Sequence, residues 1–151
     1  MYLMVSMAAL LLGPADPGAG PDREAATSPP SVYHGNWRVL AADDAGGQAT
    51  MRIDIQHSPG EREGTGSYAL YQPFCDLIAG GRITGASDCD LMDQGGEMAV
   101  RADGRRMVIT FAPTADGAEH RLTFRRSGRS LTGTYRNADL VRAVRLERAP
   151  E

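Results

Sequence analysis

The chain has 151 residues and a net charge of −3, and 42% of its residues are hydrophobic. This length suits one domain with a core of ordinary size. So small a net charge gives no indication of a nucleic-acid partner. Its distribution is uneven, because residues 1–100 contain 5 Arg against 13 Asp and Glu, whereas residues 101–151 contain 11 Arg against 6.

The first twelve residues, MYLMVSMAALLL, form an uncharged apolar run. The run is too short for a transmembrane helix, which needs about 20 residues, and it is typical of the apolar core of a secretory signal peptide. We therefore predict a signal peptide over residues 1–20 and a periplasmic or secreted protein. Residues 21–31 are rich in Pro, Ala and acidic groups, which predicts a disordered linker, and the folded domain is expected over residues 32–149.

Eight runs in this domain alternate apolar and polar residues and end at turn signals, which predicts β-strands. The clearest alternation is in the second run, where Met51, Ile53 and Ile55 share one face. The predicted strands begin at Gly35 and then cover residues 48–57, 66–71, 97–101, 106–111, 120–126, 130–135 and 141–147. Residues 73–94 follow no period, so we expect a loop there with at most one short strand over 82–86.

The connections between the last five strands are short, so neighbouring strands are expected to pair in an antiparallel meander. An open sheet of eight strands would leave two exposed edges, and closure into a barrel removes them. The predicted fold is therefore all-β, an antiparallel up-and-down meander of about eight strands closed into a small barrel. A β-sandwich is the alternative.

Cys75 and Cys89 are the two cysteines of the chain. An even pair in an exported protein predicts a structural disulfide. The loop that it closes has about 15 residues, which corresponds to roughly 3 kcal/mol in the chain-entropy model. Neither a CxxC spacing nor a nearby His supports a metal or redox site.

No catalytic or metal-binding motif accompanies the other polar residues. Asp88, Asp90, Asp93 and Glu97 do not match an EF-hand loop, because Met92 occupies a ligand position. The three histidines lie in no HExxH or similar motif. We therefore expect no metal, no cofactor and no enzymatic activity. The histidines are His34, His57 and His120.

Large side chains are expected to point into the barrel. They either fill it or line a site for one small apolar or amphipathic ligand, which an eight-stranded barrel can hold. The residues expected to line such a site are Trp37, Met51, Tyr68, Met107, Phe111, Phe124 and Tyr135.

The sequence Gly35-Asn36-Trp37 resembles the G-x-W signature of the calycins, the lipocalins and their small bacterial relatives. This resemblance implies that Trp37 closes one end of the barrel beneath an arginine from near the last strand, for which Arg142 and Arg145 are the candidates. Residues 35–40 (GNWRVL) are also similar to the periplasmic inhibitors of secreted bacterial metalloproteases. Those proteins insert an N-terminal tail into the protease, which implies the same role for the residues before Val32.

A second local resemblance concerns residues 131–138 (LTGTYRNA), which look avidin-like. Avidins line their biotin site with several tryptophans, and Trp37 is the sole tryptophan of this chain. Biotin is therefore rejected as a ligand.

Two functions remain open: a carrier of a small apolar ligand, or a protein-binding barrel such as a protease inhibitor. We expect a monomer without a membrane span in either case. The interior volume discriminates the two, because a filled interior favours the protein-binding barrel. Alternate arginines on a strand usually form a solvated face. The alternative hypothesis is that Arg121, Arg125, Arg126 and Arg129 bind an anionic polymer.

Overall fold

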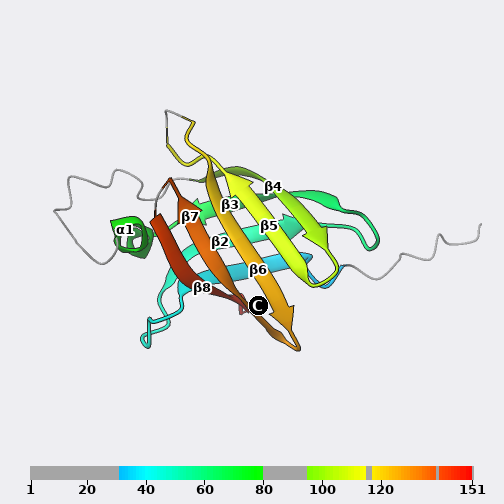
Figure 1. The fold of residues 1–151 in the computed structure, drawn as a ribbon, viewed down its shortest axis with the longest axis horizontal. Coiled ribbons are helices and arrows are strands. Elements are labelled where there is room, and N and C mark those ends of the chain that lie inside the picture. The colour runs from blue at the N-terminus through cyan, green and yellow to red at the C-terminus, as the bar shows by residue number, and fades with distance from the viewer. Residues whose placement is uncertain (1–30, 80–94, 115–116, 139, 151) are drawn as a thin grey trace, which may run out of the picture.

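The computed structural model describes residues 31–79, 95–114, 117–138 and 140–150. Eight antiparallel strands form a closed barrel in which each strand pairs with its neighbours in the chain (Figure 1). The predicted all-β meander is confirmed. The strands are β1 (Gly35–Ala41), β2 (Ala49–Gln56), β3 (Glu63–Leu70), β4 (Gly95–Asp103), β5 (Arg106–Phe111), β6 (His120–Ser127), β7 (Ser130–Asn137) and β8 (Leu140–Arg148).

The barrel closes where β1 pairs with β8. The register runs from Trp37 opposite Arg148 to Ala41 opposite Val144. Closure satisfies the backbone groups that an open sheet would expose at its two edges. It also brings the G-x-W sequence beside the C-terminal end of the last strand.

The alternation along each strand separates the core from the surface. In β2, Met51, Ile53 and Ile55 are 0% exposed, whereas Arg52 on the opposite face is exposed. Successive side chains of a strand point to opposite faces, so period-2 patterning produces an apolar interior and a polar exterior.

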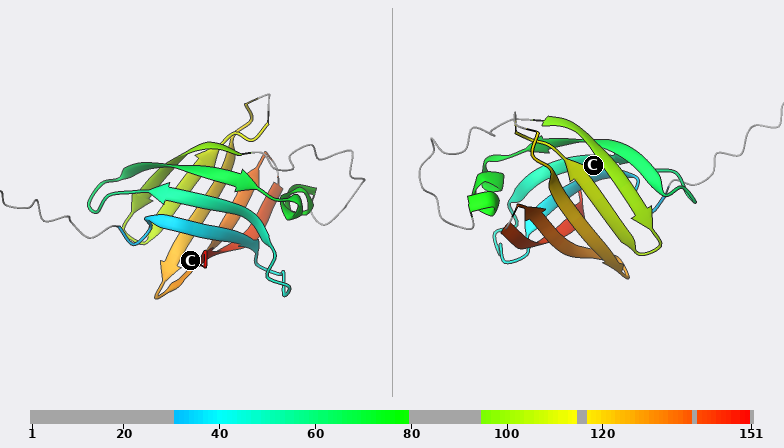
Figure 2. Two further views of the ribbon diagram at one scale, coloured as in Figure 1. Left: turned by 180° about the vertical axis from the view of Figure 1, so that it is seen from behind. Right: turned by 45° about the horizontal axis from the view of Figure 1, so that its top comes forward.

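The segment after β3 contains a helix, α1 (Gln72–Ala79), at one end of the barrel (Figures 1 and 2). The prediction of a loop is therefore wrong for the residues of α1. Pro73 suits the first turn of a helix, and Phe74 and Leu77, three residues apart, share the face that is buried against the barrel. Two turns are too short to show a 3.6-residue period in the 22-residue segment. The expected strand over 82–86 lies outside the described residues.

Two positions require glycine, Gly35 through its backbone conformation and Gly133 through close packing. Gly35 has a φ of 109°, and a Cβ there would lie 2.7 Å from the Arg148 guanidinium. A Cβ on Gly133 would collide with the backbone carbonyl oxygen of Thr123 on the neighbouring strand. The Arg148 guanidinium is the flexible end of a long side chain, so it is the positive φ that requires a glycine at the start of the G-x-W sequence.

None of the described residues forms a helix long and apolar enough to cross a membrane. The predicted signal peptide lies outside the described residues, as does the predicted linker apart from Ser31.

Candidate functional site

The barrel interior contains the residues that were expected to contact a ligand. All seven are buried: Trp37 (5% exposed), Met51 (0%), Tyr68 (7%), Met107 (0%), Phe111 (4%), Phe124 (0%) and Tyr135 (0%). The structure thus brings them together in one hydrophobic core.

The middle of the interior is filled by side chains. Ligand sites are concave cavities of roughly 300 Å³ or more, and side chains that line a void of that size have surface that no neighbouring atom covers. Met51, Met107, Ile109 and Phe124 are 0% exposed, so no such void adjoins them. These side chains pack against one another in the hydrophobic core.

Aromatic rings gather at the end of the barrel that carries α1, here called the helix end. Phe74 of α1 is 0% exposed. Its ring centroid lies 5.5 Å from that of Tyr135, 6.2 Å from His120 and 6.3 Å from Phe111. The helix therefore covers this end of the barrel with Phe74 and with Leu77, which is also buried. Phe74 was expected among the large side chains that fill the barrel, but the helix that carries it was not, because the segment was assigned to a loop.

Two polar groups lie inside this aromatic cluster. The Tyr135 hydroxyl and His120 Nδ1 are joined by a 2.7 Å hydrogen bond, and His120 is 1% exposed. Burial raises the pKa of the Tyr135 hydroxyl well above its ordinary value. Tyr135 therefore stays neutral at physiological pH, and the hydrogen bond offsets the cost of burying it.

The opposite end of the barrel, here called the tryptophan end, is closed by Trp37 and Arg148. The Arg148 guanidinium carbon lies 3.9 Å from the centroid of the Trp37 ring, a cation–π contact. Arg148 also donates hydrogen bonds to the carbonyls of His34 (2.6 Å) and Val32 (3.1 Å). Trp37 Nε1 donates to the carbonyl of Tyr33 (2.8 Å).

The arginine over Trp37 is therefore Arg148, in place of the candidates Arg142 and Arg145. Arg145 donates to Glu147 and to the carbonyl of Ala41. Arg142 pairs in register with Tyr135 near the helix end. The strand register identifies Arg148, because it lies directly opposite Trp37. It also falls on the face of β8 that carries the inward residues Val144 and Leu146.

Hydrogen bonds fasten the chain before β1 to the tryptophan end. The Ser31 hydroxyl lies 2.7 Å from His57 Nδ1 and accepts a hydrogen bond from the Tyr33 amide. The Tyr33 hydroxyl donates to the carbonyl of Gly104 at 2.8 Å. Burial raises the pKa of the Tyr33 hydroxyl, so it remains a donor.

The closed antiparallel meander and the Trp37–Arg148 contact agree with the resemblance carried by Gly35-Asn36-Trp37. The fold is a calycin-like small β-barrel.

No family model and no curated protein matches the chain. Two solved structures are similar to it, crystal structures of two single-substitution mutants of the fluorescent protein UnaG. Their sequences are 14% and 16% identical to this one, and each has a TM-score of 0.41. Each match covers 79% of this chain and 97% of the UnaG chain. Likenesses this remote carry no conclusion about function.

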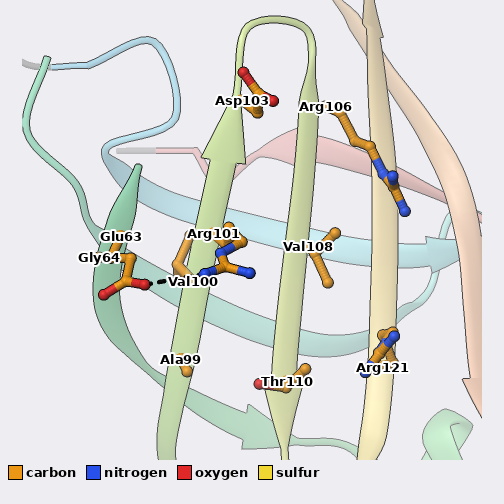
Figure 3. A pocket seen from close by; sticks show the side chains of 10 residues that line it. All are labelled: Glu63, Gly64, Ala99, Val100, Arg101, Asp103, Arg106, Val108, Thr110 and Arg121. Atoms are coloured by element: carbon orange, nitrogen blue, oxygen red, sulfur yellow. Dashed lines mark hydrogen bonds and ion pairs between the residues drawn. The ribbon is translucent and has the colours of Figure 1, made fainter. Parts of the chain in front are cut away.

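The outer wall of the calycin-like barrel has a groove of about 590 Å³ over β3 to β6 (Figure 3). Its floor consists of short side chains, among them Ala99, Val108 and Thr110. Arg106 and Arg121 lie along it, and Arg101 forms a 3.2 Å ion pair with Glu63. A second hollow, of about 600 Å³, adjoins the tryptophan end.

The remaining expected sites fall partly outside the described residues. Cys75 is half-buried in α1, and Cys89 lies outside the described part of the chain, so their disulfide stays a prediction. Asp88, Asp90 and Asp93 lie outside it as well. Within the described ranges no group of three or more His, Cys, Asp or Glu could hold a metal ion.

Replacing Arg148 tests the closure of the tryptophan end. We expect Arg148→Gln to lower the free energy of unfolding by about 1 kcal/mol, since it removes an exposed cation–π contact and charged hydrogen bonds. Urea unfolding followed by the fluorescence of Trp37 measures this loss at the site itself. Arg142→Gln is the matched control, with an expected change within about 0.5 kcal/mol. Equal losses in both variants would contradict a specific role for Arg148.

Proposed function

We propose that the protein is an exported, non-enzymatic, calycin-like barrel that binds a protein partner with its outer surface. The observation that carries this proposal is the filled interior. The fold is compatible with ligand binding, since eight strands can enclose one small ligand. Here, however, the side chains in the middle of the barrel are 0% exposed, so a ligand there would have to displace core residues.

A protease of the type inhibited by the similar periplasmic proteins is the partner that the resemblance suggests. The chain enters the barrel at the tryptophan end, where Ser31, Tyr33 and His34 are held by hydrogen bonds. A tail that precedes a fixed anchor loses less conformational freedom on binding, which favours affinity. Export and a monomeric state are part of this proposal.

A small apolar ligand is the second candidate, and the aromatic cluster at the helix end favours it. Phe111 and Tyr135, two of the residues expected to contact a ligand, lie directly beneath Phe74. If α1 moved away, it would uncover an aromatic cup of the kind that binds apolar ligands.

Native mass spectrometry of the protein recovered from the periplasm of an expressing cell separates the two candidates. We expect a cleaved monomer without a bound small molecule. A co-purifying molecule that is lost on denaturation would contradict the proposal and establish the carrier. An uncleaved chain recovered from the cytosol would contradict export.

A further inference from the structure

Three rows of outward side chains cross the sheet from β4 to β8, because the strand register aligns them. The middle row begins with Arg101 on β4. Its positions on β5 to β8 carry short uncharged side chains: Val108, Thr123, Thr134 and Ala143. These four positions span roughly 14 Å at the spacing of neighbouring strands. The groove of Figure 3 is the β4–β5 end of this row.

Arginines border the middle row on both sides. On one side Arg106 of β5 is the direct cross-strand partner of Arg125 on β6. On the other side Arg121 of β6 is the direct partner of Arg136 on β7. All four are exposed. Arg125 lies four positions after Arg121 along β6, so the two arginine rows lie roughly 13 Å apart. We call the middle row with its four arginines the arginine lane.

Like charges directly opposite each other destabilise a sheet. Few acidic residues in the described ranges offset the repulsion within the Arg106–Arg125 and Arg121–Arg136 pairs. Within the described ranges, Arg106, Arg125 and Arg136 form no ion pair. Arg121 is bonded to Glu119 at 2.7 Å. Among the described residues, Asp103 is the direct cross-strand partner of Arg106 without forming an ion pair, and Glu63 is bonded to Arg101. The arginine lane thus has an excess of positive charge that folding does not require.

We propose that the arginine lane binds an extended acidic segment of a partner protein. The inference rests on the proposed function and names the surface and the partner chemistry. Successive side chains of an extended chain point to opposite sides, so consecutive carboxylates lying along the middle row would face the two arginine rows in turn. Arg binds carboxylates bidentately.

The chemistry of the lane favours a peptide over a nucleic acid. Single-stranded nucleic acids bind to basic grooves that also offer aromatic rings for base stacking. In the described part of β4 to β8, the aromatic side chains Phe111, His120, Phe124 and Tyr135 are all buried inside the barrel. The lane offers guanidinium groups and short side chains alone.

The test measures binding of fluorescein-labelled octaglutamate to the full chain by fluorescence anisotropy. We expect binding that weakens steeply between low and physiological salt, because exposed charges are screened. Arg125→Gln and Arg136→Gln together should weaken it about tenfold, since one exposed ion pair changes an equilibrium by roughly two- to fivefold. Arg52→Gln, which removes an exposed arginine from β2, is the matched control and should leave the affinity unchanged.

Several results would overturn the proposal: no binding, a flat salt response, or an equal loss with Arg52→Gln. Tighter binding of an oligothymidylate of the same length would assign the lane to nucleic acid. Thermal unfolding checks the variants, because Arg125→Gln relieves repulsion from Arg106 and should keep or raise the midpoint, whereas a clear fall would contradict the argument from repulsion. If octaglutamate does not bind but mass spectrometry finds the barrel free of ligand, the arginine lane proposal is contradicted and the proposed function stands. If a small molecule is found in the barrel, the proposed function is contradicted, whereas the peptide experiment still decides the arginine lane.

Discussion

Phe124→Ala is expected to lower the free energy of unfolding by about 4 kcal/mol, a large part of the stability of a small domain. Phe124 is 0% exposed and lies between Met107 and Gly133 on the neighbouring strands. A Cβ on Gly133 would collide with the backbone of β6, so the strands there cannot close in, and the lost ring leaves a cavity. Urea unfolding followed by circular dichroism gives the value.

Two comparisons make the Phe124 experiment decisive about the filled interior. Phe124→Leu keeps most of the volume and should cost about 1 kcal/mol. The cavity of Phe124→Ala should also take up benzene, which would raise its thermal midpoint, because an apolar cavity stays dry and binds apolar molecules. A loss below about 1 kcal/mol for Phe124→Ala would contradict a packed interior and restore support for a ligand carrier.

Phe74→Ala is expected to lower the free energy of unfolding by about 3 kcal/mol and to loosen α1. Phe74 is 0% exposed among the rings of Phe111, His120 and Tyr135. Chemical unfolding measures the loss. Tyr71→Ala is the matched control, because Tyr71 is 38% exposed just before the helix, and its removal should change stability by less than about 0.5 kcal/mol.

The same variant tests the second candidate function. If the helix end is an apolar site that Phe74 occupies, Phe74→Ala should bind the dye 8-anilinonaphthalene-1-sulfonate with increased fluorescence while its circular dichroism stays native. A variant that remains folded without binding the dye would count against a site at this end.

Much of the fold could be predicted from short-range pattern. Alternation such as that of Met51, Ile53 and Ile55 identifies a strand with one buried face, because the side-chain period of a strand is two. Short turns then leave nearest-neighbour antiparallel pairing. Closure of the sheet into a barrel was predicted because eight strands in an open sheet would expose two edges.

The helix and the closing arginine could not be predicted in this way. A two-turn helix has too few residues for a clear period, and its packing depends on the aromatic cluster that Phe74 meets at the end of the barrel. Arg148 lies 111 positions after Trp37, and only the pairing of β1 with β8 places the two opposite each other. Arg142 and Arg145 were reasonable alternatives in sequence, but the register decides which arginine reaches the ring.

The sequence by itself determined the strand pattern, the inward-facing set and the Trp37 signature, because these depend on side-chain alternation along a single strand. The tertiary structure alone decided that the interior is filled, that α1 covers one end, and that four arginines align across three strands. Each of these is a relation between residues on different elements. Such relations depend on register and on side-chain volume in three dimensions, which local periodicity does not specify.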